Sequence, residues 1–309
     1  MNGGPQARPI LIVGAGRSGT NLLAMALGAL PGLHNAYEQR YVWTKGASPF
    51  ASDIRGSTDC TPANAAWIRA HFARIGAGQR VVDKTPSNAL RLGFCRAVFP
   101  AAQIISVVRD PYDNIASRLR ELGKIGHTAT PEADVPAAAA RGRVAILTDR
   151  IAHARRIVAR GNVPLGLIPY AGLDQQTETA RIAVSGRGQR WGERVPGMAD
   201  ISRAHGTAAA LTHQWLACRT QVDLASADMD ADSILTIRYE DMVQVPGTTA
   251  TRVAEFLGLP DATDLDTYLR ANARADTVGQ AAARMTPTQH AAITAYLRAS
   301  GYTAAGQQA

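Results

Sequence analysis

Cysteine is scarce in this chain, and its scarcity argues against two kinds of structure. The 309 residues include three cysteines, Cys60, Cys95 and Cys218. They lie far apart and form no CxxC pair, so they fit neither a disulfide framework nor a zinc site. The seven histidines form no HxH or HExxH pattern, which argues against metal catalysis. We therefore expect no metal site and a reducing, cytoplasmic setting.

Long apolar runs are also missing from the sequence. No stretch approaches the roughly 18 apolar residues of a membrane-spanning helix. The N-terminal region contains no charged segment followed by the apolar run of a secretion signal. The sequence thus predicts neither a membrane span nor export.

Aromatic residues and blocks of like charge are scarce as well. Phe, Trp and Tyr make up 6% of the chain, and no block of five or more like charges occurs. The chain is nevertheless basic, with a formal net charge of +8 and a pI near 9.8. Scattered basic residues without interleaved aromatics are not typical of a nucleic-acid surface, so no nucleic acid is expected as a partner. A positive field of this kind attracts small anionic ligands instead.

The elements that are present alternate between strand and helix. This alternation predicts one α/β domain over residues 1–309, with a P-loop-like open parallel sheet and helices on both faces. Residues 125–206 are expected to form a helical or irregular insertion, or a lid, within it. Strands are expected at Ile10–Val13, Arg80–Val82, Gln103–Val108 and Ser233–Arg238, and helices at about Thr20–Leu30, Pro62–Ile75, Ala89–Phe99, Pro111–Leu122 and Thr207–Ala227.

The first expected strand leads into a glycine-rich turn and then a helix. Glycines allow successive backbone N–H groups to converge on an anion at the N-terminus of the helix. A Walker loop requires Lys and then Ser or Thr where this chain has Thr20 and Asn21, so ATP or GTP hydrolysis is disfavoured. The residues expected to hold phosphate are Arg17, Ser18, Gly19, Thr20 and Asn21.

The same glycines also satisfy a second pattern. Gly14-x-Gly16-x-x-Gly19 matches the dinucleotide fingerprint, and Glu38 lies roughly where a ribose-binding acid would stand. That acid ends a second strand, whereas residues 31–37 look like a turn without a clear strand. An NAD- or FAD-dependent oxidoreductase therefore stays open as the less favoured hypothesis.

A second ligand motif follows the strand Gln103–Val108. Arg109 stands at the carboxyl end of that strand, where open α/β sheets bind ligands, and its guanidinium suits a phosphate. Asp110 is expected to cap the next helix, and Pro111 suits its first turn. Ser117 lies about two helical turns later and is expected to add a hydroxyl donor to the same phosphate.

In these motifs the chain resembles the sulfotransferases that use 3'-phosphoadenosine 5'-phosphosulfate (PAPS). The resemblance implies PAPS as co-substrate, 3',5'-adenosine bisphosphate (PAP) as product, and no metal. Four segments carry it in the family's order: Gly16-Arg17-Ser18-Gly19-Thr20, then Asp83-Lys84-Thr85-Pro86, then Arg109-Asp110-Pro111 with Ser117, and Ile237-Arg238-Tyr239-Glu240-Asp241-Met242.

The resemblance also implies roles for single residues. The glycine-rich loop would bind the 5'-phosphosulfate, with Arg17 at the leaving oxygens. Lys84 would stabilise the transition state near the sulfonyl group. Arg109 and Ser117 would hold the 3'-phosphate, and Tyr239 would lie beside the adenosine. A solvent-facing Lys84 paired with Asp83, and a core tyrosine at position 239, are the structural alternatives.

The catalytic base departs from one branch of the family. Cytosolic members carry a histidine shortly after the Lys-Thr pair, where this chain has Pro86-Ser87-Asn88. Golgi-type and several bacterial members use a glutamate shortly after the loop helix, and Glu38 matches that position. Glu38 is thus the expected base, with a surface ion pair to Arg40 as the alternative. The family's C-terminal Arg-Lys-Gly loop is absent, and Arg274 and Arg284 are candidates to replace it.

Three functions follow from these observations, in order of preference. The first is a sulfotransferase that moves the sulfuryl group of PAPS to a hydroxyl or amine of a small-molecule, lipid or glycan acceptor. The second is the oxidoreductase, and the third is a nucleotide-binding protein without catalysis. Tyr37, Tyr41, Trp43 and Trp191 are candidates to line an acceptor pocket or to serve as packing residues. A homodimer formed through helices is compatible with a chain of this size.

Overall fold

The protein is built around a parallel sheet. The computed structural model describes residues 8–47, 52–124 and 192–302. Five strands pair in the order β2-β3-β1-β4-β5, and every pairing is parallel. Their bounds are β1 Ile10–Val13, β2 Leu33–Tyr37, β3 Arg80–Lys84, β4 Gln103–Val108 and β5 Ile234–Arg238.

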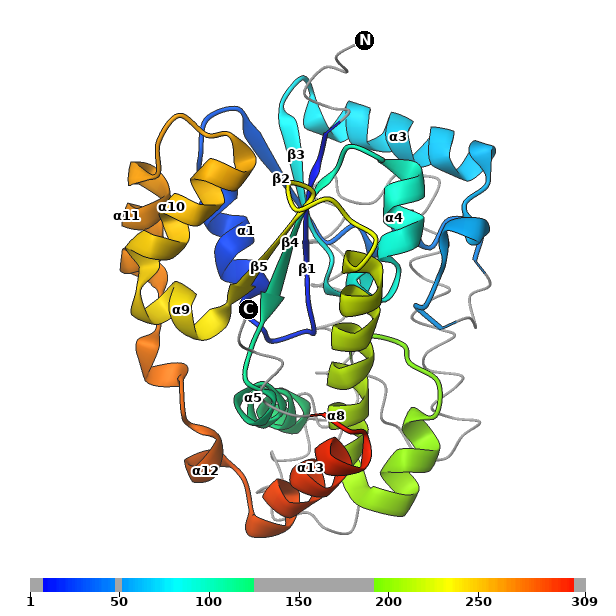
Figure 1. Ribbon diagram of the computed structural model, residues 1–309, viewed down its shortest axis with the longest axis vertical. Helices are drawn as coiled ribbons and strands as arrows, with labels where there is room; N and C mark the ends of the chain where they lie inside the picture. Colours follow the sequence, from blue (N-terminus) through cyan, green and yellow to red (C-terminus); the bar gives the residue numbers. More distant parts are fainter. Residues whose placement is uncertain (1–7, 48–51, 125–191, 303–309) are drawn as a thin grey trace, which may run out of the picture.

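Helices cover both faces of this sheet (Figure 1). On β1, Ile10 and Ile12 pack into one apolar cluster, and Leu11 and Val13 into the other, because successive strand residues face opposite sides. The first cluster contains residues of α1 (Thr20–Gly28), α9 (Tyr239–Gln244), α10 (Pro246–Leu257) and α11 (Thr263–Asn272), and the second those of α3 (Pro62–Gly76), α4 (Leu92–Val98), α8 (Met198–Ser226) and α13 (Pro287–Ala299).

The other elements lie between these strands and helices along the chain. Helix α5 (Pro111–Lys124) follows β4 and contacts both α8 and α12 (Ala281–Arg284). The remaining elements are α2 (Arg40–Trp43), η2 (Ser57–Asp59), η3 (Pro86–Leu90) and η5 (Ala275–Thr277). No helix in the described part of the chain is long and apolar enough to cross a membrane.

The expected α/β architecture is confirmed, and most element positions agree with the structure. Helix α4 begins later than expected because residues 86–90 form a 3-10 turn. The helix expected at Thr207–Ala227 is the second part of α8, which is interrupted at Gly206 (φ 81°, ψ 171°). Most of the expected insertion, residues 125–191, lies outside the described residues.

One expectation was wrong: residues 33–37 do form a strand, β2, which ends immediately before Glu38. The chain between α1 and Glu38 therefore does not speak against a dinucleotide site, but the order of the strands does. In the dinucleotide-binding fold the acid follows the strand adjacent to the first. Here β3 lies between β1 and β2, which puts Glu38 two strands, roughly 10 Å, from the loop that follows β1.

Candidate active site

All five strands deliver their next residues to the same edge of the sheet, because the strands are parallel. The glycine-rich loop follows β1, Glu38 follows β2, and Lys84 ends β3. Arg109 follows β4, and Tyr239 follows β5. The structure thus places every expected site residue at, or one helix away from, the carboxyl edge, which is where open α/β sheets bind ligands.

The loop between β1 and α1 is tightly packed against its neighbours. Gly14 has φ 145°, and a Cβ there would lie 2.3 Å from the carbonyl oxygen of Val107. Gly19 has φ 91°, and a Cβ there would lie 2.3 Å from Cδ2 of Tyr239. Both positions therefore require glycine, because any side chain would meet strain and collision together.

The N-terminus of α1 offers unoccupied donors. The Ser18 N–H closes the turn by donating to the Ala15 carbonyl at 3.1 Å. The N–H groups of Gly19, Thr20 and Asn21 have no acceptor among the described residues. No acidic side chain stands in the first turn of α1, so nothing there competes with an anion. Helix geometry and the positive end of the helix dipole make this a place for a phosphate-like group.

The two ligand motifs meet at this loop. The Arg17 Nε donates to Ser117 Oγ at 3.3 Å, although the two residues are 100 positions apart. The Arg109 Nη1 donates to the Arg17 carbonyl at 3.1 Å. Arg109 and Ser117 are buried, and Arg17 is exposed. A hydroxyl and two guanidiniums from separate motifs therefore surround one end of the loop.

Tyr239 lies beneath Arg109 and is largely enclosed. The Arg109 guanidinium stacks 4.3 Å from the centre of the Tyr239 ring, and the Tyr239 hydroxyl bonds to Thr277 Oγ1 at 2.6 Å. Only 7% of Tyr239 is exposed. Arg109 Nη2 also donates to the Thr277 carbonyl at 2.7 Å, while its Nε is buried without an acceptor among the described residues.

The C-terminal segment reaches the same place. The two carboxylate oxygens of Asp113, in the first turn of α5, accept from the N–H groups of Gly279 and Ala281 at 2.6 and 2.8 Å. Arg274, one candidate for the missing basic loop, forms an exposed ion pair with Asp276 at 3.1 Å. The segment around η5 is therefore fixed beside Arg109, although it lacks the family's usual sequence.

Glu38 and Lys84 form an ion pair at the other end of the edge. The Lys84 Nζ lies 2.5 Å from Glu38 Oε1 and 4.4 Å from the centre of the Tyr37 ring. The Lys84 side chain is 5% exposed and that of Glu38 is 44% exposed. The alternative of a solvent-facing Lys84 was wrong, because this side chain is buried. The alternative of a Glu38–Arg40 ion pair was also wrong, because Glu38 pairs with Lys84 and Arg40 lies 3.5 Å from Asp53.

A buried carboxyl group lies directly behind this pair. Asp83 accepts hydrogen bonds from Trp43 Nε1 at 2.7 Å, Thr85 Oγ1 at 2.8 Å and Asn88 Nδ2 at 3.1 Å. Thr85 Oγ1 in turn accepts from the Gln39 N–H at 2.9 Å. Burial raises the pKa of Asp83 to about 7, even though the bonds from Thr85 and Trp43 act to lower it. This network joins the segment after β2 to the segment after β3.

The exposure of the aromatic residues near this network determines which of them remain candidates to line an acceptor pocket. Trp43 is fully buried, packs edge-on against Phe72 and Phe99, and is a core residue. Tyr37 and Tyr41 are partly exposed, and Trp191 lies outside the described residues. Tyr37 lies directly beside the ion pair, with its ring centre 4.4 Å from Lys84 Nζ.

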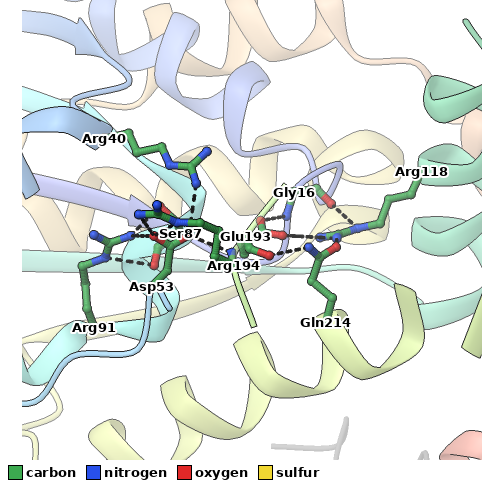
Figure 2. Close-up of polar contacts among 9 residues, drawn as sticks. All are labelled: Gly16, Arg40, Asp53, Ser87, Arg91, Arg118, Glu193, Arg194 and Gln214. Carbon is green, nitrogen blue, oxygen red and sulfur yellow. Dashed lines mark hydrogen bonds and ion pairs between the residues drawn. The ribbon is translucent and has the colours of Figure 1, made fainter. Parts of the chain in front are cut away.

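Two buried charge clusters flank the edge, and Figure 2 shows both. Asp53 lies within 3.5 Å of Arg40, Arg91 and Arg194. Burial alone would raise the pKa of Asp53, but the three guanidiniums lower it to about 2. In the second cluster Glu193 Oε1 accepts the Gly16 N–H at 2.6 Å, and its Oε2 lies 3.2 Å from Arg118.

Sequence analysis missed the residues that brace the loop. Asn114 and Arg118 share one face of α5 with Ser117, and both donate to the Gly16 carbonyl, at 3.0 and 3.1 Å. The spacing was an available signal, because Asn114 lies three residues before Ser117 and four before Arg118, and residues three and four apart lie on one helix face. Glu193 gave no such signal, since it is 177 positions from Gly16.

Comparisons with known proteins identify the family and the fold. A protein-family model described as the sulfotransferase family matches residues 9–161, about half of the chain. The chain belongs to the sulfotransferase family. The matched region contains the glycine-rich loop, Glu38, Lys84, Arg109 and Ser117, whereas Tyr239 lies beyond it. No curated protein matches this sulfotransferase in sequence.

Solved structures resemble the sulfotransferase over nearly its whole length. The sulfotransferase domain from the curacin biosynthetic pathway has a TM-score of 0.51 and 13% identity, covering 96% of this chain and 98% of that one. The domain from the Synechococcus PCC 7002 olefin synthase has a TM-score of 0.49 and 15% identity, with 98% of both chains covered. The Alicyclobacillus acidocaldarius sulfotransferase scores 0.46 at 14% identity, with 98% and 99% covered. The first of these likenesses shows a shared fold.

Proposed function

We propose that this sulfotransferase transfers the sulfuryl group of PAPS to a hydroxyl or amine of an acceptor, with Glu38 as the base. The meeting of the two ligand motifs carries the proposal. Arg17, in the loop, contacts Ser117, and Arg109 holds the Arg17 carbonyl. Free N–H groups, a hydroxyl and two cations in one place suit a nucleotide with phosphate groups at both ends.

The loop would hold the 5'-phosphosulfate. The free N–H groups of Gly19, Thr20 and Asn21 supply donors, and the exposed Arg17 guanidinium supplies a positive charge. Arg109 and Ser117 would hold the 3'-phosphate, and the buried Arg109 Nε without an acceptor among the described residues fits that role. Tyr239 would lie beside the adenosine. PAPS itself supplies the activated sulfuryl group and a good leaving phosphate.

Glu38 and Lys84 are placed for the chemistry of the acceptor. Lys84 holds Oε1 of Glu38, while Oε2 has no partner among the described residues and the side chain is 44% exposed. Oε2 is therefore available to take the proton of an acceptor hydroxyl as its oxygen bonds to sulfur and the bond from sulfur to the leaving phosphate breaks. Lys84 would neutralise charge on the sulfonyl oxygens.

The acceptor is proposed to be a small molecule, a lipid or a glycan. Tyr37 supports an apolar wall for it, because its ring lies beside Lys84 and remains partly exposed. The resemblance of the base to the Golgi-type branch stays part of this proposal. A cytoplasmic setting and a homodimer also stay predictions.

Replacing Glu38 by Gln tests the proposed base. We expect sulfuryl transfer from radiolabelled PAPS, measured against a panel of phenolic, lipid and sugar hydroxyl acceptors, to fall by roughly 10²- to 10⁴-fold in Glu38→Gln. The affinity for PAP should stay within about three-fold, because Glu38 follows β2, two strands away from the loop that follows β1.

Two results would contradict the proposal. Equal transfer rates in the wild type and Glu38→Gln would remove Glu38 as the base. Tight NAD binding without PAPS consumption would support the oxidoreductase instead. Glu255→Gln is a suitable control, because Glu255 is an exposed residue of α10 that contacts none of the proposed site residues.

A further inference from the structure

Gly16, in the middle of the phosphate loop, is held on both sides by side chains from distant parts of the chain. Its N–H donates to Glu193 Oε1 at 2.6 Å. Its carbonyl accepts from Asn114 Nδ2 at 3.0 Å and from Arg118 Nε at 3.1 Å. A Cβ at Gly16 would lie 3.1 Å from Glu193 Oε1, so the carboxylate lies against the loop backbone (Figure 2).

The carboxylate that holds the loop is itself fixed. Glu193 Oε2 lies 3.2 Å from both terminal nitrogens of Arg118, and the two side chains are 2% and 0% exposed. Gln214 of α8 donates to the Glu193 carbonyl at 2.6 Å and accepts from Arg118. Because Glu193 and Arg118 neutralise each other, the pair adds little net charge beside an anion site.

These contacts set the directions of two peptide groups. The C=O and N–H of a trans peptide point in opposite directions. Holding the Gly16 carbonyl therefore also fixes the N–H of Arg17, the next residue. The preceding peptide is fixed by Glu193 at the Gly16 N–H and by the Ser18 N–H at the Ala15 carbonyl. Arg17 has φ 69°, which a non-glycine residue adopts only where its surroundings impose it.

We propose that Glu193 is a positioning residue that sets the phosphate loop in its binding conformation before the nucleotide arrives. It acts through the Gly16 N–H and does not need to touch the nucleotide. A preset loop loses less conformational freedom on binding, so its effect belongs to the affinity for the 5'-phosphate. This inference rests on the proposed binding of PAP at the loop.

The test uses two nucleotides that differ in the group the loop holds. PAP carries a 5'-phosphate, and adenosine 3'-monophosphate (3'-AMP) does not. Titration calorimetry should find PAP binding weakened about ten-fold or more in Glu193→Ala, with the affinity for 3'-AMP unchanged. Glu193→Gln should keep PAP binding within about three-fold, because its amide oxygen still accepts the Gly16 N–H.

Two further variants separate positioning from a general loss of stability. Glu193→Asp keeps the charge that Arg118 needs but withdraws the carboxylate from Gly16, so it should fold and still lose PAP affinity. Ile293→Ala truncates a fully buried residue of α13 that contacts none of the loop residues. It should lower the melting temperature and leave PAP affinity unchanged.

The possible results distinguish a failure of the positioning role of Glu193 from a failure of the proposed function. If the wild type does not bind PAP, the proposed function is wrong. If the wild type binds PAP and the Ala and Asp variants bind it equally well, only the positioning role is wrong. An equal loss of PAP and 3'-AMP affinity would also overturn it, because the effect would then not be specific to the loop. Tighter PAP binding in Glu193→Ala would mean that the carboxylate repels the nucleotide.

Discussion

At the scale of single residues, the candidate base and its lysine are backed by one buried carboxyl group. Asp83 alternates with Lys84 along β3, so the two side chains point to opposite sides of the strand. Asp83 receives donors from Trp43, Thr85 and Asn88, and Thr85 holds the Gln39 N–H, next to Glu38. The buried hydrogen-bond network around Asp83 therefore fixes the positions of Glu38 and Lys84.

The raised pKa of Asp83 makes a prediction about stability and pH. Its pKa is about 7 in the folded protein, against 3.8 for an ordinary aspartate, because burial disfavours the charged form. A raised pKa contributes stability that is full below the unfolded value and is lost as pH rises through the folded value. Asp83→Asn lacks this titration. Its melting temperature relative to the wild type should therefore rise between about pH 4 and pH 7 and level off above pH 8.

His71 also titrates within this pH range, but its contribution to stability cancels when Asp83→Asn is compared with the wild type. Burial lowers the pKa of His71 to about 4, and His71 is present in both proteins. The measurement is the melting temperature of both proteins by calorimetry from pH 4 to pH 9. A difference that stays constant across this range would mean that Asp83 does not titrate there.

At the scale of elements, the glycine-rich loop packs directly against β4 because Gly14 has no side chain. Gly14 has φ 145°, and a Cβ there would lie 2.3 Å from the Val107 carbonyl oxygen, a backbone atom of β4. Gly32 also has a positive φ, 77°, but a Cβ there would meet nothing within 4 Å. A side chain at Gly32 would meet backbone strain alone, whereas a side chain at Gly14 would meet both strain and a steric collision.

Alanine substitutions at these two glycines give matched variants. Gly32→Ala should lower the free energy of unfolding by roughly 1 kcal/mol, the cost of the left-handed conformation alone. Gly14→Ala should cost roughly 3 kcal/mol or more and also abolish PAP binding, because the loop must shift away from β4. Urea unfolding and titration calorimetry measure the two effects. Equal costs at both positions would mean that the contact with Val107 is not tight.

Elements whose signals are local were predictable, and those that depend on distant contacts were not. Buried runs of β-branched residues predicted β1, β3 and β4, and the residues that follow them carried the motifs. Strand β2 was missed because it contains the polar residues His34 and Asn35 and follows the turn-like pair Pro31-Gly32. Its strand conformation comes from pairing with β3, a tertiary effect that outweighs local propensity.

In the candidate site, too, local contacts were predictable from the sequence and distant contacts were not. Asp110 caps α5 by accepting the Asp113 N–H at 3.0 Å, as its place before Pro111 predicted. The pairing of Glu38 with Lys84 and the bracing of Gly16 by Glu193 join segments 46 and 177 positions apart. No spacing rule within a helix or strand reaches that far, so these contacts required the fold.

At the scale of the whole molecule, parallel strands bring five separate sequence segments to one edge. The sheet order places the loop after β1 between the ends of β3 and β4, so Lys84 and Arg109 flank it on opposite sides. The formal charge of +8 adds a field that favours a polyanionic ligand over a neutral one. Under the proposed function, this arrangement would place the nucleotide at the centre of the edge and the acceptor chemistry at the β2 side.

The most direct test of this account is titration calorimetry of the purified protein with PAP, NAD and ATP, repeated on Arg109→Ala. The account predicts tight binding of PAP, much weaker binding of NAD and ATP, and loss of PAP affinity in the variant, because Arg109 would hold the 3'-phosphate. Preference for NAD, or PAP binding that does not depend on the 3'-phosphate or on Arg109, would contradict it.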